Sequence, residues 1–146
     1  MKIGICSGYF QRFHNGHIDY IKTAVKCFDV VIVIINNDLQ QRNKYKDFTD
    51  IKNVREIEEE IKLYFPSVII KVSVDEDGTV CKTLHCLRKS YPDDVLFFCK
   101  DGDRNIRNIP EKESLEQLHI IFRQFTNIKK DSSSKIMAGE VKNEGC

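Results

Sequence analysis

Two histidines lie three residues apart in the stretch SGYFQRFHNGHIDYIKTA, residues 7–24. At this spacing His14 and His17 project from one side of a helical turn, with Cβ atoms roughly 5–6 Å apart. Gly16 lies between them and has no side chain that could block an incoming group. Because a helix N-terminus offers free N–H groups and a partial positive charge, the arrangement predicts a binding site for phosphate.

Other chemistries are compatible with the same two residues. Taken alone, His14 and His17 could be a surface pair or part of a metal site. The glycine spacing does not match GxGxxG or GxxxxGK[ST], so neither a dinucleotide fingerprint nor a P-loop is present. The six cysteines contain no CxxC pair, and no protein-bound metal is expected. The position of the histidines between a predicted strand and a predicted helix favours phosphate.

The apolar pattern indicates the elements that must position this site. Short continuous apolar runs are typical of strands buried on both faces, as in a parallel sheet covered by helices. Apolar residues spaced three and four apart indicate amphipathic helices between these runs. Strands are expected at residues 2–6, 30–35, 68–74, 95–99 and 118–122, and helices over 18–28, 51–65 and 80–91.

This alternation predicts an α/β fold, a doubly wound five-stranded parallel sheet of the Rossmann-like kind. In such sheets ligands bind beyond the carboxyl ends of the strands, where the strand order reverses. Polar and charged residues concentrate in the segments after the predicted strands. These segments, expected as loops or turns up to the next helix, are 7–17, 36–46, 75–79, 100–104 and 123–135. Residues 104–113 are also expected as a loop.

Composition restricts the classes of partner. The 146 residues suit a single domain, and 23 Lys and Arg balance 22 Asp and Glu. Without a strong global charge, neither nucleic acid nor an anionic membrane is an expected partner. The apolar run at the N-terminus is shorter than a signal peptide needs, and no run approaches the roughly 20 residues of a membrane span. A cytoplasmic protein is expected.

Several motifs together carry a family resemblance. GYFQRFHNGH resembles the HxGH signature of the cytidylyltransferase-like nucleotidyltransferase superfamily. Lys44 and Lys46 follow the second predicted strand, where relatives have phosphate-binding lysines, and Arg55 resembles an arginine of the next helix. KDGD at 100–103 and SSSKI at 132–136 resemble two further motifs of the superfamily. The chain is most similar in motif form to glycerol-3-phosphate cytidylyltransferases and heptose-1-phosphate adenylyltransferases.

The resemblance implies an activity. A nucleotidyl group would pass to a small phosphorylated polyol or sugar with release of pyrophosphate, with CMP from CTP favoured and ATP, as in the heptose type, as the alternative. The resemblance also implies Mg²⁺ with the nucleoside triphosphate, a homodimer, a nucleotidyltransferase domain over residues 1–137 and a short tail over 138–146. Two rivals remain: a non-catalytic nucleotide-binding module, and a flavodoxin-like or NAD-binding domain, which lacks its glycine pattern here.

The resemblance also assigns roles to residues of this chain. The catalytic residues are His14, His17, Lys44 and Lys46. The nucleotide-binding residues are Gly8, Tyr9, Phe10, Gly16, Lys100, Gly102, Asp103, Ser132, Ser133 and Ser134. The acceptor-binding residues are Arg55, Arg104 and Arg107. Five positions depart from the family pattern, namely Gln11, Asp101, Asn127, Lys130 and Asp131, and they leave the choice of nucleotide open.

Overall fold

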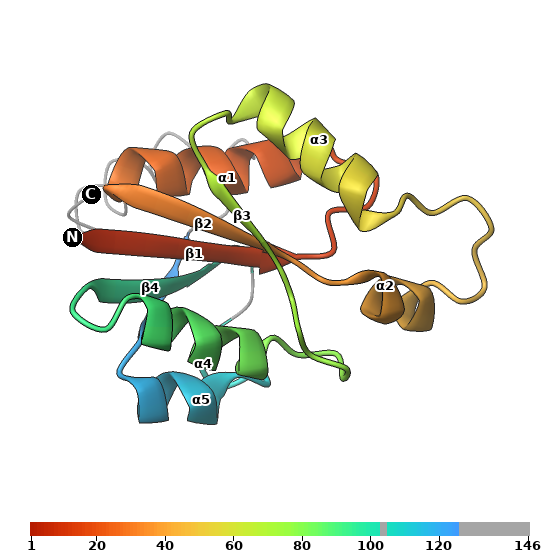
Figure 1. Ribbon diagram of the computed structural model, residues 1–146. Helices are drawn as coiled ribbons and strands as arrows, with labels where there is room; N and C mark the ends of the chain where they lie inside the picture. The colour runs from red at the N-terminus through yellow and green to blue at the C-terminus, as the bar shows by residue number, and fades with distance from the viewer. Residues whose placement is uncertain (103–104, 126–146) are drawn as a thin grey trace.

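The computed structural model describes residues 1–102 and 105–125, which form a five-stranded sheet and five helices (Figure 1). The strands are β1 (Lys2–Gly8), β2 (Val30–Ile35), β3 (Ile69–Val72), β4 (Val95–Lys100) and β5 (Ile121–Gln124). The helices are α1 (Asn15–Cys27), α2 (Asp38–Lys44), α3 (Val54–Tyr64), α4 (Cys81–Ser90) and α5 (Lys112–Leu118). The predicted α/β class is confirmed.

All neighbouring strands are parallel, in the order β3-β2-β1-β4-β5. The chain builds outward from β1 to β3 and then crosses back to β4 on the other side of β1. The register pairs Ile5 with Ile32 on one side of β1 and Cys6 with Cys99 on the other. The strand order therefore reverses between β1 and β4, where an open sheet of this kind binds its ligands.

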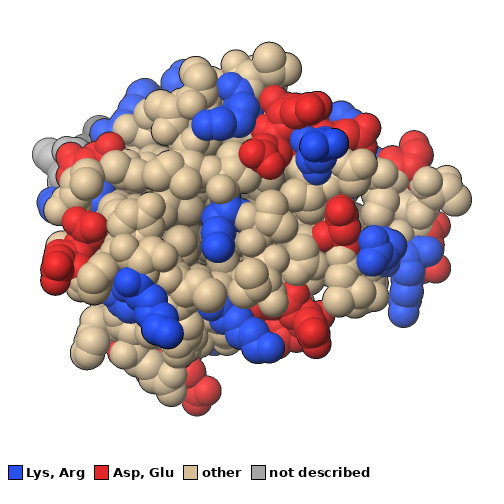
Figure 2. Space-filling view, viewed as in Figure 1, with Lys and Arg blue, Asp and Glu red and all other residues tan. Residues whose placement is uncertain are grey.

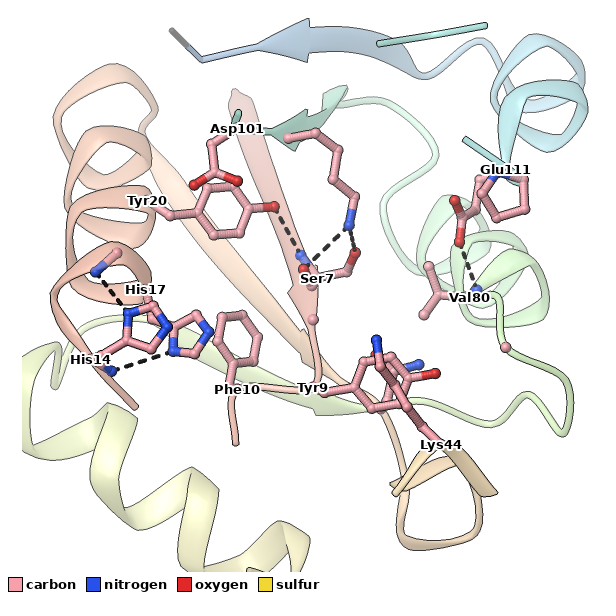
Figure 3. Close-up of a pocket in the computed structure, with 16 residues that line it drawn as sticks. Ser7, Tyr9, Phe10, His14, His17, Tyr20, Lys44, Val80, Asp101 and Glu111 are labelled. Carbon is pink, nitrogen blue, oxygen red and sulfur yellow. Dashed lines mark hydrogen bonds between the residues drawn. The ribbon is translucent and has the colours of Figure 1, made fainter. Parts of the chain in front are cut away.

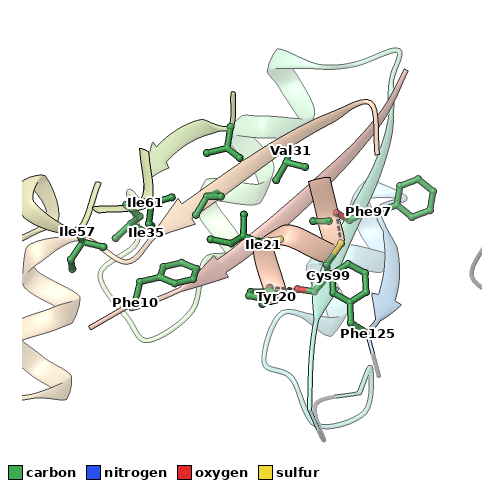
Figure 4. Packing of buried hydrophobic residues seen from close by; sticks show 14 of the residues in the cluster. Phe10, Tyr20, Ile21, Val31, Ile35, Ile57, Ile61, Phe97, Cys99 and Phe125 are labelled. Carbon is green, nitrogen blue, oxygen red and sulfur yellow. Dashed lines mark hydrogen bonds between the residues drawn. The ribbon is translucent and has the colours of Figure 1, made fainter. Parts of the chain in front are cut away.

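The sheet buries apolar side chains on both faces, because successive residues of a strand point to opposite sides. Ile3 and Ile5 of β1 belong to the core under α4 and α5, whereas Cys6 belongs to the core under α1 and α3. Figure 4 shows the second of these cores, where Ile21 of α1 and Ile57 of α3 lie over the sheet. Helices on both faces make the sheet doubly wound, as the continuous apolar runs predicted.

The short helix α2 lies in a segment that was expected to be a loop. Asn37 accepts a hydrogen bond from the backbone N–H of Gln40 at 2.9 Å, and the side chain of Gln40 accepts from the backbone N–H of Asn37 at 3.0 Å. This reciprocal cap starts the helix. The buried residues of α2 are Gln40 and Gln41, so no apolar stripe marks it in the sequence.

The boundary between α5 and β5 also differs from the prediction. A strand was expected over 118–122, but Leu118 ends α5 and β5 begins at Ile121. His119 lies between them with a left-handed backbone (φ 55°) and closes the helix. Leu115 is the buried residue of this helix, and its two apolar residues, Leu115 and Leu118, are too few to give a periodic signal.

The surface carries charges of both signs. On the face shown in Figure 2, Lys and Arg side chains are interspersed with Asp and Glu. No helix within the described residues is long and apolar enough to cross a membrane.

Candidate active site

A cavity of about 470 Å³ lies at the carboxyl ends of β1 and β4 (Figure 3). One wall comes from α1 and the loop before it, the floor from the strand ends, and the opposite wall from α2 and the segments that precede α4 and α5. The histidine wall contains Phe10, His14, Gly16, His17 and Tyr20. The floor contains Ser7, Gly8, Tyr9, Asn36, Lys100 and Asp101. The carboxylate wall contains Lys44, Gly78, Val80, Pro110 and Glu111.

The two histidines cap the helix that they begin. The backbone N–H of Gly16 donates to Nδ1 of His14 at 3.0 Å, and the backbone N–H of His14 donates to Nδ1 of His17 at 3.4 Å. A neutral imidazole whose Nδ1 accepts a hydrogen bond carries its proton on Nε2. These bonds therefore select the tautomer in which each Nε2–H is a donor, and donors of this kind suit phosphate oxygens.

Aromatic packing holds the imidazole of His17 in place. Its ring centroid lies 3.9 Å from that of His14, 5.7 Å from Phe13 and 5.2 Å from Phe10. Phe10 is buried in a left-handed backbone conformation (φ 55°), which a bulky residue keeps only where packing fixes it. Its ring fits under Gly8, where an added Cβ would be 3.2 Å away. The loop between β1 and α1 thus orients the imidazole of His17 through its aromatic side chains.

The floor of the cavity ties the two central strands to α1. The backbone N–H of Ser7 donates to the Tyr20 hydroxyl at 3.2 Å, and this hydroxyl donates to the carbonyl oxygen of Cys99. Lys100 Nζ donates to Ser7 Oγ at 2.8 Å and to its carbonyl oxygen at 3.3 Å. Burial raises the pKa of Tyr20 well above its usual value, so the phenol remains a neutral bridge.

Lys44 supplies a cation above the floor. Its Nζ lies 4.3 Å from the ring centroid of Tyr9, a cation–π contact, while the side chain remains exposed. Burial, followed by the neighbouring Tyr45, raises the pKa of the Tyr9 hydroxyl, which therefore stays protonated. No ion pair within residues 1–102 and 105–125 involves Lys44, and the residue lines the cavity.

A buried amide network positions α2 and hence Lys44. Gln41 Nε2 donates to the carbonyl oxygens of Tyr9 at 2.9 Å and Asn36 at 3.0 Å. Gln40 accepts from Asn36 Nδ2 at 3.0 Å and donates to the carbonyl oxygen of Thr79 at 2.8 Å. The two glutamines therefore link the ends of β1 and β2 to the segment before α4.

Glu111 is a buried carboxylate on the wall opposite the histidines, and its residue is 5% exposed. Its Oε2 accepts a hydrogen bond from the backbone N–H of Val80 at 3.1 Å. Its Oε1 is buried and has no hydrogen-bond partner among the described residues. Buried polar atoms nearly always have a partner, so this oxygen is unusual.

The structure brings together eight of the residues assigned from the sequence. These are His14, His17, Lys44, Gly8, Tyr9, Phe10, Gly16 and Lys100.

Four others do not line the cavity. Lys46 follows α2 and is exposed, Arg107 lies in the loop before α5, Gly102 follows β4, and Arg55 on α3 lines a separate open hollow with Asp38 and Glu58. Asp103, Arg104, Ser132, Ser133 and Ser134 lie outside the described residues, as do Asn127, Lys130, Asp131 and the tail 138–146.

Gln11, one of the departures from the family pattern, has a structural role. Its Nε2 donates to Gln41 Oε1 at 3.0 Å and to the carbonyl oxygen of Lys52 at 2.7 Å, and its Oε1 accepts from the Lys52 backbone N–H at 3.0 Å. Gln11 therefore fastens the histidine loop to α2 and to the segment before α3. Asp101, another departure, is exposed on the cavity floor.

Sequence reasoning missed several residues of the cavity. Tyr20 follows His17 by three residues and so shares its helix face, which was a usable signal. Ser7 directly follows the first predicted strand, so the rule that places ligands at the carboxyl ends of strands could have identified it. Val80 and Glu111 belong to segments that follow β3 and β4, and no local pattern joins them to the histidines.

Known proteins are similar to this chain in sequence and in fold. A sequence model described as cytidylyltransferase-like matches residues 5–139. A phosphopantetheine adenylyltransferase from Mycoplasma mycoides subsp. mycoides SC is 28% identical over 125 residues, which cover 71% of this chain and 89% of that protein. The bifunctional protein HldE of Blochmanniella floridana is 33% identical over 117 residues, which cover 80% of this chain and 23% of that protein.

A solved structure supports the fold. The lipopolysaccharide core biosynthesis protein from Thermoplasma volcanium GSS1 aligns with a TM-score of 0.60 at 18% identity, covering 86% of this chain and 95% of that one. The family match extends over nearly the whole chain and removes the flavodoxin-like and NAD-binding alternatives. The chain belongs to the cytidylyltransferase-like family of nucleotidyltransferases.

Proposed function

We propose that this protein transfers AMP from ATP to the phosphate of a small phosphomonoester and releases pyrophosphate. The observation that carries the proposal is the pair of imidazoles of His14 and His17. Their Nδ1 atoms accept backbone hydrogen bonds at the N-terminus of α1. Their Nε2–H groups, together with Lys44, form a set of donors and cations around one cavity. Such a set suits the negative charge of reacting phosphates.

The proposed reaction needs little covalent chemistry from the protein. An oxygen of the acceptor phosphate attacks the α-phosphorus of ATP, a new P–O bond forms, and the bond from the α-phosphorus to the bridging oxygen breaks. The electron pair of that bond leaves with pyrophosphate. Positioning and charge stabilisation carry the rate of such a displacement. His14 and His17 act as hydrogen-bond donors to the α-phosphate, and neither histidine needs to accept a proton.

The relatives favour ATP over CTP. The sequence motifs favoured CTP and left ATP as the alternative, whereas the M. mycoides relative is named an adenylyltransferase. That name also makes phosphopantetheine a candidate acceptor beside the glycerol and heptose phosphates. Each of these acceptors is a phosphomonoester with an uncharged arm, so the choice between them does not alter the chemistry at the α-phosphorus.

Mg²⁺ fits this proposal as a companion of the nucleotide. Residues 1–102 and 105–125 contain no group of three or more His, Cys, Asp or Glu side chains that could hold a metal ion. Mg²⁺ commonly binds to triphosphate oxygens and needs few protein ligands. When bound it would neutralise charge on the triphosphate, while His14, His17 and Lys44 orient the two reacting phosphates.

Pyrophosphate release tests the proposal. ATP and CTP, each with Mg²⁺, are incubated with the purified protein and with phosphopantetheine, glycerol 3-phosphate or heptose 1-phosphate. We expect release with ATP and one of these acceptors, and at least tenfold less with CTP. Faster release with CTP would restore the cytidylyl alternative. Binding of nucleotide without release across the whole panel would favour a non-catalytic module.

A further inference from the structure

Glu111 does not fit a site that binds only phosphates. A carboxylate repels a triphosphate, yet this one is buried in the wall of the cavity opposite His14 and His17 (Figure 3). It makes no ion pair with Lys44, the cation on its own wall, and no other ion pair among the described residues. Within residues 1–102 and 105–125, therefore, no basic side chain neutralises this carboxylate through an ion pair.

The hydrogen bonds of Glu111 are incomplete. A carboxylate can accept about four hydrogen bonds, and the described part of the chain provides one, from the backbone N–H of Val80 at 3.1 Å. Oε1 is buried and accepts no hydrogen bond from the described residues. Leaving such an atom unpaired costs stability, and the cost is recovered when a donor arrives. The last side-chain torsion of glutamate is soft, so the carboxylate can reorient toward a ligand in the cavity that the residue lines.

The other buried carboxylate oxygen without a hydrogen-bond partner among the described residues provides a contrast. Glu60 also has a buried oxygen without a partner, but its other oxygen pairs with Lys52 Nζ at 2.6 Å, and the residue does not line the cavity. Glu111 combines an unpartnered oxygen with a place on the cavity wall. That combination points to a ligand rather than to an ion pair.

We infer that Glu111 selects the acceptor, and that the acceptor is a phosphomonoester whose uncharged arm carries a hydroxyl or amide N–H. This inference rests on the proposed function, because it takes the histidine wall as the place of the ATP phosphates. The carboxylate wall then holds the acceptor, with its arm directed at Glu111. Lys44 of the same wall supplies the cation that an acceptor phosphate needs. A phosphomonoester without such a donor leaves the carboxylate unpaired and binds more weakly.

A matched pair of variants tests the inference. Glu111→Gln keeps an oxygen for the Val80 N–H but presents an NH₂ group where the carboxylate oxygen was. Glu113→Gln makes the same chemical change at an exposed residue two positions further along the chain. Thermal unfolding of both variants checks that the fold is intact.

KM is measured for ATP and for whichever of phosphopantetheine, glycerol 3-phosphate and heptose 1-phosphate the wild type uses best. We expect Glu111→Gln to raise the acceptor KM about ten- to a hundredfold, the range for hydrogen bonds to charged groups, and to leave the ATP KM within twofold. Glu113→Gln leaves both constants unchanged. An unchanged acceptor KM in Glu111→Gln overturns the inference and leaves the proposed function standing. A rise in the ATP KM or in the Mg²⁺ requirement alone also overturns it, because the carboxylate would then face the nucleotide.

Equilibrium binding provides a readout without turnover. The three phosphomonoesters are titrated by calorimetry into wild type and Glu111→Gln, each saturated with a non-hydrolysable ATP analogue. Weaker binding to the variant supports the inference even if the wild type releases no pyrophosphate, in which case only the proposed function fails. Equal binding to both proteins, or no binding of any of the three, overturns the inference.

Discussion

The two walls of the cavity differ in how completely their polar groups are paired. On the histidine wall, backbone N–H groups occupy Nδ1 of His14 and of His17, and aromatic rings fix the second imidazole. On the carboxylate wall, Lys44 rests on an aromatic face and Glu111 keeps an oxygen that no described residue hydrogen-bonds. The first wall is preorganised for one chemical group, as a reaction centre requires. The second is incomplete until a ligand with its own donors enters.

The difference between the two walls matches two separate tasks of the proposed site, phosphate chemistry and recognition of the acceptor. The phosphate chemistry is common to all acceptors, so the residues that perform it can be held rigidly by their own loop. The candidate acceptors differ in their uncharged arms, and we propose that the residues that recognise the arm come from the separate segments before α4 and α5. Changes on the two walls should therefore have separable effects.

Replacing a histidine should have the largest effect. His17→Ala removes a donor from the preorganised wall, and we expect kcat to fall at least a hundredfold, or about 3 kcal/mol of transition-state stabilisation. The measurement is steady-state pyrophosphate release, with thermal unfolding to show that the fold persists. His85→Ala, on the exposed face of α4, is the matched control and should keep wild-type turnover. Near-normal turnover in His17→Ala would remove this residue from the mechanism.

Removing the Tyr20 bridge between α1 and the two central strands should have the next largest effect. Tyr20→Phe removes the hydroxyl that joins Ser7 to Cys99, and we expect the free energy of unfolding to fall by about 2 kcal/mol. Denaturant titration measures this loss. A loss below 0.5 kcal/mol, taken as roughly the smallest net worth of one hydrogen bond, would contradict the bridging role.

The same residue predicts a dependence on pH. Since folding raises the pKa of Tyr20 above its ordinary 10.0, the stability gained by keeping the phenol protonated is complete below about pH 10 and is lost as the pH rises further. The unfolding free energy of the wild type should therefore decline more steeply above pH 10 than that of Tyr20→Phe. Parallel curves for the two proteins would show that Tyr20 does not cause the decline.

The two lysines after β2 test whether position in the cavity matters. Lys44 lines the cavity, whereas Lys46, two residues later, does not. We expect Lys44→Gln to lower kcat/KM about tenfold, equivalent to 1.4 kcal/mol, and Lys46→Gln to lower it less than twofold. Equal losses in the two variants would mean that the loop after α2 closes over the substrate and brings Lys46 into the site.

The smallest effect is expected for a change of Gln11, which fastens the histidine loop to α2. Gln11→Ala removes three hydrogen bonds at the edge of the site, and we expect the protein to lose about 1 kcal/mol of stability with kcat within threefold of wild type. Chemical denaturation and pyrophosphate release measure the two quantities. A large fall in kcat without a loss of stability would place Gln11 in the chemistry.

The sequence predicted the parts of the site that belong to one local segment. His14, Gly16 and His17 stand between a strand and a helix, so their meeting with Gly8 and Phe10 follows from chain connectivity alone. The same holds for the two cores, because continuous apolar runs such as 30–35 can only belong to strands covered on both faces. The position of Lys100 in the cavity was also expected, because ligands of open α/β sheets bind beyond the carboxyl ends of the strands.

The parts that escaped prediction depend on contacts between distant segments. Helix α2 is held by amide hydrogen bonds of Gln40 and Gln41, which leave no apolar periodicity to read. Glu111 reaches the cavity because α5 begins beside the backbone of Val80, 31 residues earlier in the chain. The start of β5 was misplaced because apolar residues continue from the end of α5 into the strand.

A structure of the protein with Mg²⁺ and an ATP analogue carrying a methylene group between the α- and β-phosphorus tests the central claim most directly. We expect oxygens of the α-phosphate to lie within hydrogen-bond distance, about 2.7–3.2 Å, of Nε2 of His14 and of His17, while Glu111 stays clear of the triphosphate. A triphosphate bound away from both imidazoles, or one seated against Glu111, would contradict it.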